Sequence, residues 1–166
     1  MKNATYWIEK LGLQKHPEGG YYKEIYKSKE FIAKNALPAR FSGKRAFSTS
    51  IYFLLNKKEV SAFHRIKQDE IWHFYAGSSL TIHIIDQQGK YSIAQLGRHF
   101  EKGASFQVVI PAGSYFAAAV HNPASYSLMG CTVAPGFDFA DFEMPSQSKL
   151  LKLFPQHAAL IKRFSH

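Results

Sequence analysis

Residues 46–135 form a series of short apolar runs, each closed by glycine, proline or polar turn residues. The runs read AFSTSIYFLL, VSAFHRI, DEIWHFYAG, SLTIHIID, YSIAQLG, SFQVVIP, SYFAAAVH and YSLMGCTVA. Runs of this length between turn signals predict β-strands, and their succession without helical patterns predicts an all-β sandwich or barrel. The 14 Phe and 9 Tyr agree with this fold, because aromatic rings pack well on a half-buried pleated surface.

The N-terminal flank, residues 3–28, predicts a short helix followed by a strand. Asn3 is a suitable N-cap, an apolar side runs through residues 6–11, and Gly12 can end the helix. After a proline and glycine turn, the stretch YYKEIY predicts the strand. Residues 29–45 are polar and basic, and predict a mobile loop.

The C-terminal flank, residues 146–164, predicts a helical segment. Ser146 or Ser148 can cap it, and Pro155 should divide it into two pieces because proline cannot continue a helix. No linker separates the flanks from the barrel-like core. Residues 1–166 are therefore expected to form a single domain.

The composition excludes several classes of function. The formal net charge is +9, but the basic residues are spread singly, which predicts a solvated surface and no nucleic-acid partner. No apolar run reaches the length of a membrane span, and the N-terminus lacks the features of a signal peptide. With Cys131 as its one cysteine, the chain is expected to be cytoplasmic.

The stretch HRIKQDEIWHFYAG carries the main candidate site. It contains His64, then Glu70 after five residues, then Gly77 after six more. Ile66 stands where a His-x-His pair would have its second histidine. This spacing resembles the first motif of the cupin superfamily, in which two histidines, a glutamate and a glycine close one hairpin of a small β-barrel.

A second stretch, PAGSYF, resembles the second cupin motif. Pro111 and Gly113 are in place, and Phe116 stands at the usual histidine position. Together with HPEGGYY and APGFDFADFE, these motifs are similar to the cupin family catalogued as domain of unknown function 985. The resemblance covers about residues 3–164. It implies a double-stranded β-helix (jelly-roll) barrel with a short N-terminal helix and C-terminal helices, an internal pocket, and a homodimer paired through strands near the N-terminus.

The two substituted motif positions argue against a bound metal. Cupin metals are normally held by three histidines and one glutamate, and only His64 and Glu70 are kept here. Ile66 and Phe116 offer no lone pair, while an ion loses hydration on entering. We therefore expect no cofactor. If a divalent metal is bound, His64 and Glu70 are its expected ligands.

A metal-free pocket can still transfer protons. The deoxysugar 3,5-epimerases, metal-free cupins, supply the precedent of a histidine base and a tyrosine acid. His64 is the predicted base with Glu70 as its partner, because a histidine can abstract a proton beside a carbonyl near neutral pH. The candidate acids, which sequence cannot rank, are Tyr21, Tyr22, Tyr52 and Tyr75.

The expected ligand is a small polar or anionic, sugar-like metabolite. The predicted ligand contacts are Tyr22, Tyr52, Arg65, Trp72, Tyr75, Gln107 and Phe116. Glu18 is assigned to an ordinary turn, and Cys131 to an inert buried thiol. Two alternatives to an isomerase or epimerase stay open, namely a metal-dependent cupin enzyme with an incomplete ligand set and a non-catalytic small-molecule binding protein.

Overall fold

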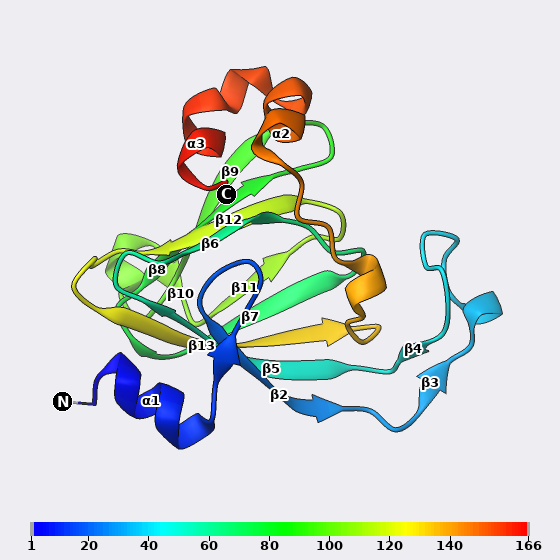
Figure 1. The fold of residues 1–166 in the computed structure, drawn as a ribbon, viewed down its shortest axis with the longest axis horizontal. Helices are drawn as coiled ribbons and strands as arrows, with labels where there is room; N and C mark the ends of the chain where they lie inside the picture. The colour runs from blue at the N-terminus through cyan, green and yellow to red at the C-terminus, as the bar shows by residue number, and fades with distance from the viewer. Residues whose placement is uncertain (1, 166) are drawn as a thin grey trace.

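A computed structural model of the chain describes residues 2–165 (Figure 1). The helices and 3₁₀ turns are α1 (Ala4–Leu11), η1 (Lys34–Ala36), η2 (Phe100–Lys102), η3 (Phe139–Asp141), α2 (Gln147–Leu153), η4 (Pro155–His157) and α3 (Ala158–Arg163). The strands are β1 (Gln14–Lys15), β2 (Tyr21–Lys27), β3 (Phe31–Ile32), β4 (Arg45–Ala46), β5 (Thr49–Asn56), β6 (Val60–His64), β7 (Asp69–Gly77), β8 (Leu80–Ile85), β9 (Tyr91–Leu96), β10 (Ala104–Ser105), β11 (Gln107–Ile110), β12 (Tyr115–Val120) and β13 (Tyr126–Ala134).

Two sheets build the body of the molecule. The larger sheet has the order β1-β2-β5-β13-β7-β11, and the smaller one has the order β10-β9-β8-β12-β6. Strands that follow one another in the sequence often lie in different sheets. The chain therefore crosses repeatedly between two layers that face each other (Figure 1). The prediction of an all-β barrel from residues 46–135 is confirmed.

The space between the sheets is filled by large apolar side chains. Strand alternation brings Phe53 of β5 and Trp72 of β7 inward, where their rings meet edge to face at 5.7 Å. Phe116 of β12 approaches Trp72 from the opposite sheet, with ring centroids 6.2 Å apart. All three side chains are almost fully buried, so this aromatic layer ties the two sheets together.

The helical flanks match their sequence signals. The Asn3 side chain accepts a hydrogen bond from the Tyr6 amide, and Gly12 ends α1 with a left-handed φ of 64°. Ser146 caps α2 by accepting from the Lys149 amide, and Pro155 separates α2 from α3. Across residues 2–165, no helix is both long enough and apolar enough to cross a membrane.

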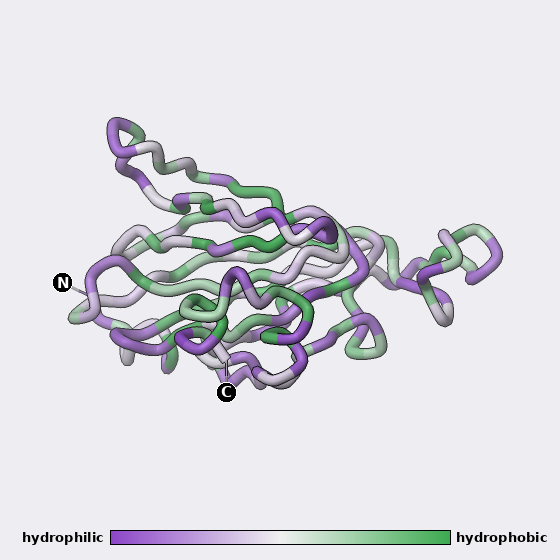
Figure 2. Tube along the Cα trace, turned by 90° about the horizontal axis from the view of Figure 1, so that it is seen from above, coloured by the Kyte–Doolittle hydropathy of each residue, from purple (hydrophilic) through white to green (hydrophobic). Residues whose placement is uncertain are grey.

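The segment 29–45 differs from the predicted loop. It contains β3, a 3₁₀ turn and the first residue of β4, and β3 and β4 pair with each other. Figure 2 shows this arm standing away from the body, with hydrophilic and hydrophobic stretches alternating along it. Its base is fixed by Arg45, whose guanidinium forms two 2.6 Å hydrogen bonds with the buried carboxylate of Asp141.

Candidate functional site

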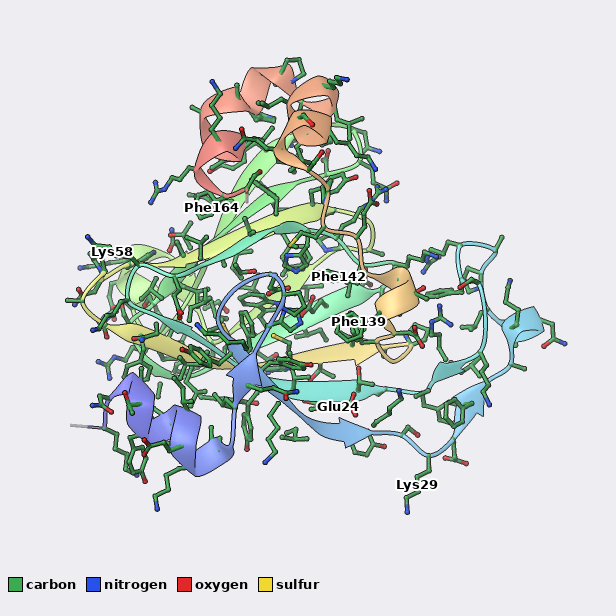
Figure 3. The ribbon with its side chains drawn as sticks, viewed as in Figure 1. Glu24, Lys29, Lys58, Phe139, Phe142 and Phe164 are labelled. Carbon is green, nitrogen blue, oxygen red and sulfur yellow. The ribbon has the colours of Figure 1, made fainter. Side chains whose placement is uncertain are left out.

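A cavity of about 240 Å³ opens at the end of the barrel where β5 and β7 begin and β13 ends. Its polar lining consists of Gln14, His16, Glu18, Tyr22, Glu24, Thr49, His64 and Glu70. Its other walls are Ile51, Phe53, Ile66, Trp72, Cys131, Val133, Phe137, Phe139 and Phe142. Figure 3 shows Phe139 and Phe142 on the segment that lies across this end. The cavity lining thus combines ionisable and polar side chains with a largely aromatic set of apolar ones.

The HPEGG turn delivers two of the polar groups. Gly19 and Gly20 have φ angles of 109° and 73°, which other residues rarely adopt. A Cβ on Gly19 would collide with the Val60 carbonyl, so glycine lets the turn lie directly against β6. The Ala62 amide then donates to the Glu18 carbonyl at 2.8 Å. This close approach carries the Glu18 side chain into the cavity, where it is 5% exposed.

Glu18 and His64 form a buried pair. His64 Nε2 lies 2.9 Å from Glu18 Oε2, and His64 Nδ1 lies 2.7 Å from the Ala62 carbonyl oxygen. Because a carbonyl can only accept, Nδ1 carries a proton and donates it. The Ser61 hydroxyl donates to the other Glu18 oxygen at 2.8 Å. Each polar atom of the pair therefore has a partner, which fixes the imidazole ring.

This pairing favours charge on both groups. Burial by itself would lower the pKa of His64, but the Glu18 carboxylate, helped by the Ala62 carbonyl, raises it above its ordinary value. Burial would raise the pKa of Glu18, yet the charge and hydrogen bond of His64 hold it below its ordinary value. Burial lowers the pKa of the neighbouring His16, against the attraction of Glu18. These shifts favour the charged forms of His64 and Glu18 and the neutral form of His16.

The pKa of Glu70 shifts in the opposite direction to that of Glu18. Burial raises its pKa to about 7, against the attraction of the His64 charge and with the repulsion of the Glu18 charge. A carboxyl with this pKa exchanges its proton readily near neutral pH. Burial also raises the pKa of the Cys131 thiol beside it well above its usual value, so this thiol stays protonated. Glu70 is therefore the group of the cavity suited to both giving and taking a proton.

The structure places several of the predicted site residues together. His64, Glu70, Tyr22 and Trp72 all line the cavity. Phe116 is buried behind it, with its ring centroid 4.1 Å from that of His64. The direct carboxylate partner of His64 is Glu18, in place of the expected Glu70. Strand β6 ends at His64, and the HPEGG turn folds back against it. Glu18 of this turn thereby occupies the position next to His64 Nε2 where Glu70 was expected.

Three predicted ligand contacts lie on the outer face of the larger sheet. Tyr52 and Tyr75 pack edge to face at 6.0 Å, and Tyr75 is 50% exposed. A bulge in β7 at the pairing with β13 sets Tyr75 over Gly130, where a Cβ would strike its hydroxyl. Gln107 pairs with His73 at the exposed edge strand β11. Alternation along the strands turns these side chains away from the cavity, so they are not contacts of a ligand bound there.

Arg65 also lies outside the cavity. Its guanidinium binds Glu143 Oε2 through Nε at 2.7 Å and through a terminal nitrogen at 2.6 Å. It follows His64 directly, so its side chain projects from the other face of the strand. The structure therefore does not bring Arg65 to this cavity, and its charge is matched by Glu143.

Sequence reasoning missed Glu18 and His16 as cavity residues. Glycines next to Glu18 were the available signal, because they permit the close approach that the structure shows. The segment after β13 supplies the aromatic mouth, with Phe139 and His16 stacked at 6.4 Å and Phe142 at 6.0 Å from His16. Phe alternates with acidic residues along this segment, a pattern that does not by itself show which opening the segment covers.

The residues of the cavity do not fit the metal that cupins commonly hold. Ile66 is 4% exposed in the cavity wall, and Phe116 covers one face of the His64 ring. Both ring nitrogens of His64 are occupied by protein oxygens. Within residues 2–165, no group of three or more His, Cys, Asp or Glu side chains is arranged to hold a metal ion.

Comparisons with known proteins agree with this architecture. The family model described as "Cupin superfamily (DUF985)" matches residues 5–145. A protein from Shewanella oneidensis is 43% identical, with 100% of this chain and 99% of that chain covered and a TM-score of 0.89. A hypothetical protein from Leishmania major is 35% identical, with 99% of each chain covered and a TM-score of 0.90.

A more distant likeness shows the fold alone. Oxalate decarboxylase from Bacillus subtilis is 14% identical and has a TM-score of 0.55, with 90% of this chain and 36% of that chain covered. The comparison with curated proteins gives no match. The family model, the two full-length relatives and the two facing sheets lead to one conclusion: the chain belongs to the DUF985 family of the cupin superfamily.

Proposed function

We propose that the cavity binds a small, uncharged polar metabolite and moves a proton next to its carbonyl group, as an isomerase or epimerase does. The observation that carries this proposal is the contrast between two neighbouring acid–base groups. Glu70 has a pKa of about 7, while Glu18 and His64 form a fixed ion pair beside it. Opposed environments of this kind are how a single site supplies both a mobile proton and a fixed charge.

In the proposed reaction, the Glu70 carboxylate takes the proton from the carbon beside the carbonyl. The electron pair of that C–H bond moves to the carbonyl oxygen, and the nearby imidazolium of His64 stabilises the developing negative charge. If Glu70 returns the proton to the neighbouring carbon while the hydroxyl proton of that carbon passes to the first oxygen, the result is an isomerisation. If Tyr22 instead gives its proton to the opposite face of the first carbon, the result is an epimerisation, and a proton then passes through solvent from Glu70 to the Tyr22 phenolate. Tyr22 is the one predicted acid that lines the cavity, and its ring lies 4.6 Å from that of His16.

The charge of the lining supports an uncharged ligand over an anionic one. No Lys or Arg belongs to the lining among the described residues, while Glu18, Glu24 and Glu70 do. An anion would have to replace its hydration with these groups. The cavity volume is below the roughly 300–1,000 Å³ of drug-sized sites, so a ligand of a few carbons fits. The aromatic side chains of the lining favour the carbon skeleton, and its polar side chains favour the oxygens.

Deuterium exchange tests the chemistry without knowledge of the natural substrate. Dihydroxyacetone and other short hydroxyketones are incubated with the protein in deuterated water, and loss of the α-proton signal is followed by NMR. We expect the protein to accelerate exchange in these neutral compounds more than in pyruvate, an anionic ketone. Glu70→Gln should lower the rate at least about 100-fold, as expected for loss of a general base.

Tyr75→Phe is the matched control, because Tyr75 lies outside the cavity and the change removes one hydroxyl. Tyr22→Phe makes the same change inside the cavity. Equal exchange rates in Glu70→Gln and in the wild-type protein would refute proton transfer by Glu70. Stabilisation of the protein by these compounds without exchange would identify the cavity as a binding site alone.

A homodimer paired through β2 is the second part of the proposal. β1 pairs with β2 only at Tyr21 and Tyr22. Beyond them, Ile25 and Tyr26 are 49% and 54% exposed on the same strand. An exposed apolar edge strand favours pairing with a second copy. Sedimentation should show a dimer, and Ile25→Lys together with Tyr26→Lys should convert it to a monomer. A monomeric wild-type protein would contradict this.

A further inference from the structure

The other end of the barrel carries an open groove of about 910 Å³. It lies where α1 begins and where β5 and β7 end, so the length of β5 separates it from the cavity. The eight residues of β5 span roughly 25 Å at about 3.3 Å per residue. Figure 3 shows Lys58, in the turn after β5, far from Phe139 and Phe142 at the cavity. The two openings are therefore separate sites.

The groove is lined by positive charge without negative charge. Lys2, Lys57, Arg98 and Lys102 line it, and so do His99 and His121. No Asp or Glu is among its described lining residues. Some basic side chains elsewhere do meet carboxylates, as Lys15 does with Glu59 and Arg65 with Glu143.

None of the four Lys and Arg residues of the groove takes part in an ion pair within the described part of the chain. Glu101 precedes Lys102 in η2 but does not line the groove. A concave surface that gathers cations without carboxylates concentrates the positive potential of the protein. A bound anion would relieve this repulsion.

Neutral hydrogen-bond donors accompany the charges. Ser79 lines the groove and is 6% exposed, and its hydroxyl has no hydrogen-bond partner in the structure. Ala4 and Thr5, the first residues of the eight-residue helix α1, also line it. The first amides of a helix have no partner within the helix, and the helix dipole places partial positive charge there. The amides at the start of α1 therefore add neutral donors to the four Lys and Arg side chains.

We propose that this groove binds a chain of phosphate groups, either a free polyphosphate or the polyphosphate part of a nucleotide. Such a chain presents anionic oxygens along its length, which suits several cations spread along a groove. Arg98 can bind two oxygens of one phosphate, while Lys2, Lys57 and Lys102 act as separate point charges. This site does not depend on the function proposed for the cavity.

Calorimetric titration with sodium tripolyphosphate, at about 0.1 M salt, tests the proposal. Arg98→Ala with Lys102→Ala should weaken binding about tenfold or more. The control is Lys29→Ala with Lys34→Ala on the exposed arm, which removes the same charge. It should change affinity less than about twofold. Lys57→Gln, a second groove variant, should also weaken binding, and unfolding temperatures establish that each variant is folded.

The comparison ligands separate the outcomes. Tighter binding of ATP than of tripolyphosphate would identify a nucleotide as the source of the phosphates, and equal binding would identify polyphosphate itself. Three results would overturn the proposal. These are equal weakening by the groove and arm variants, equal affinity for citrate, and binding of a single-stranded oligothymidylate without binding of tripolyphosphate.

Discussion

His64 Nε2 lies 2.9 Å from Glu18 Oε2, which joins the last residue of β6 to a turn that precedes β2. The pair is nearly sealed from solvent, with side-chain exposures of 3% and 7%. Charges at such a depth are stable only when paired and hydrogen-bonded, and here Ser61 and Ala62 complete the set.

Glu18→Gln should destabilise the protein and lower the pKa of His64. The change leaves the imidazolium buried without its counter-charge, and breaking such a pair costs about 3–5 kcal/mol. The folded-state pKa of His64 is raised, so its stabilising contribution is present below about pH 6.5 and is lost as pH rises through the raised value. Histidine NMR titration and urea unfolding measure both effects.

The carboxylate side of the same pair has the opposite pH dependence. The folded-state pKa of Glu18 is lowered, so its contribution is present above its ordinary pKa and is lost as pH falls through the lowered value. The benefit of the pair is thus largest between these limits. A Glu18→Gln variant as stable as the wild-type protein at pH 6 would contradict the assignment of an ion pair.

Glu70→Gln should stabilise the protein at alkaline pH. Burial raises the pKa of Glu70 to about 7, so the wild-type protein loses stability as pH rises from its ordinary pKa through 7, where the buried carboxyl must ionise. The amide does not ionise, and the gain at pH 8 should reach up to about 3 kcal/mol. Denaturant unfolding at pH 5 and pH 8 should show the difference growing with pH. A constant difference would place the Glu70 pKa outside this interval.

Ile66→His should increase the affinity of the cavity for a divalent metal. Ile66 lines the cavity and is almost fully buried, so an imidazole there would face His64 and Glu70. One added nitrogen ligand should raise Co²⁺ affinity at least about tenfold above that of the wild-type chain. Absorption titration measures the affinity, with Ile66→Gln as the control for a polar group of weaker ligating power. Stoichiometric metal in the untagged wild-type protein would contradict our reading of the ligand set.

Asp141→Asn should destabilise the protein by about 3–5 kcal/mol, because it leaves the Arg45 guanidinium buried without a counter-charge. Gln68 also donates to Asp141 at 2.8 Å, so more than one element loses its anchor. Thermal unfolding measures the loss. Asp138→Asn, in the same segment but exposed, is the control and should change stability little. Equal effects of the two substitutions would contradict a specific role for the buried pair.

The strands and caps could be predicted because their signals are local. Asn3 and Gly12 act on neighbouring residues, and each strand of the barrel is closed by its own turn residues. The arm was misjudged as a loop because β3 and β4 have two residues each, too few to show alternation. Their pairing is a contact between the two ends of the segment.

The site was only half predictable for the same reason. His64 and Glu70 share a stretch whose spacing resembles a known motif, whereas Glu18 reaches His64 only after the N-terminal turn folds against β6. An EGG turn looks alike in sequence whether it faces solvent or a cavity. Tyr75 was predicted as a ligand contact, but the structure sets its side chain and that of Glu70 on opposite faces of β7.

The Arg45–Asp141 pair has a consequence for how this cavity can change. Asp141 ends the 3₁₀ turn that begins with Phe139, and Arg45 is at the base of the arm. The aromatic mouth is thereby held from outside, by a segment that contributes no cavity-lining residue of its own. Insertions or deletions in the arm would move Arg45 and with it the aromatic segment at the cavity mouth. They would thereby change which ligands fit, without altering His64, Glu18 or Glu70.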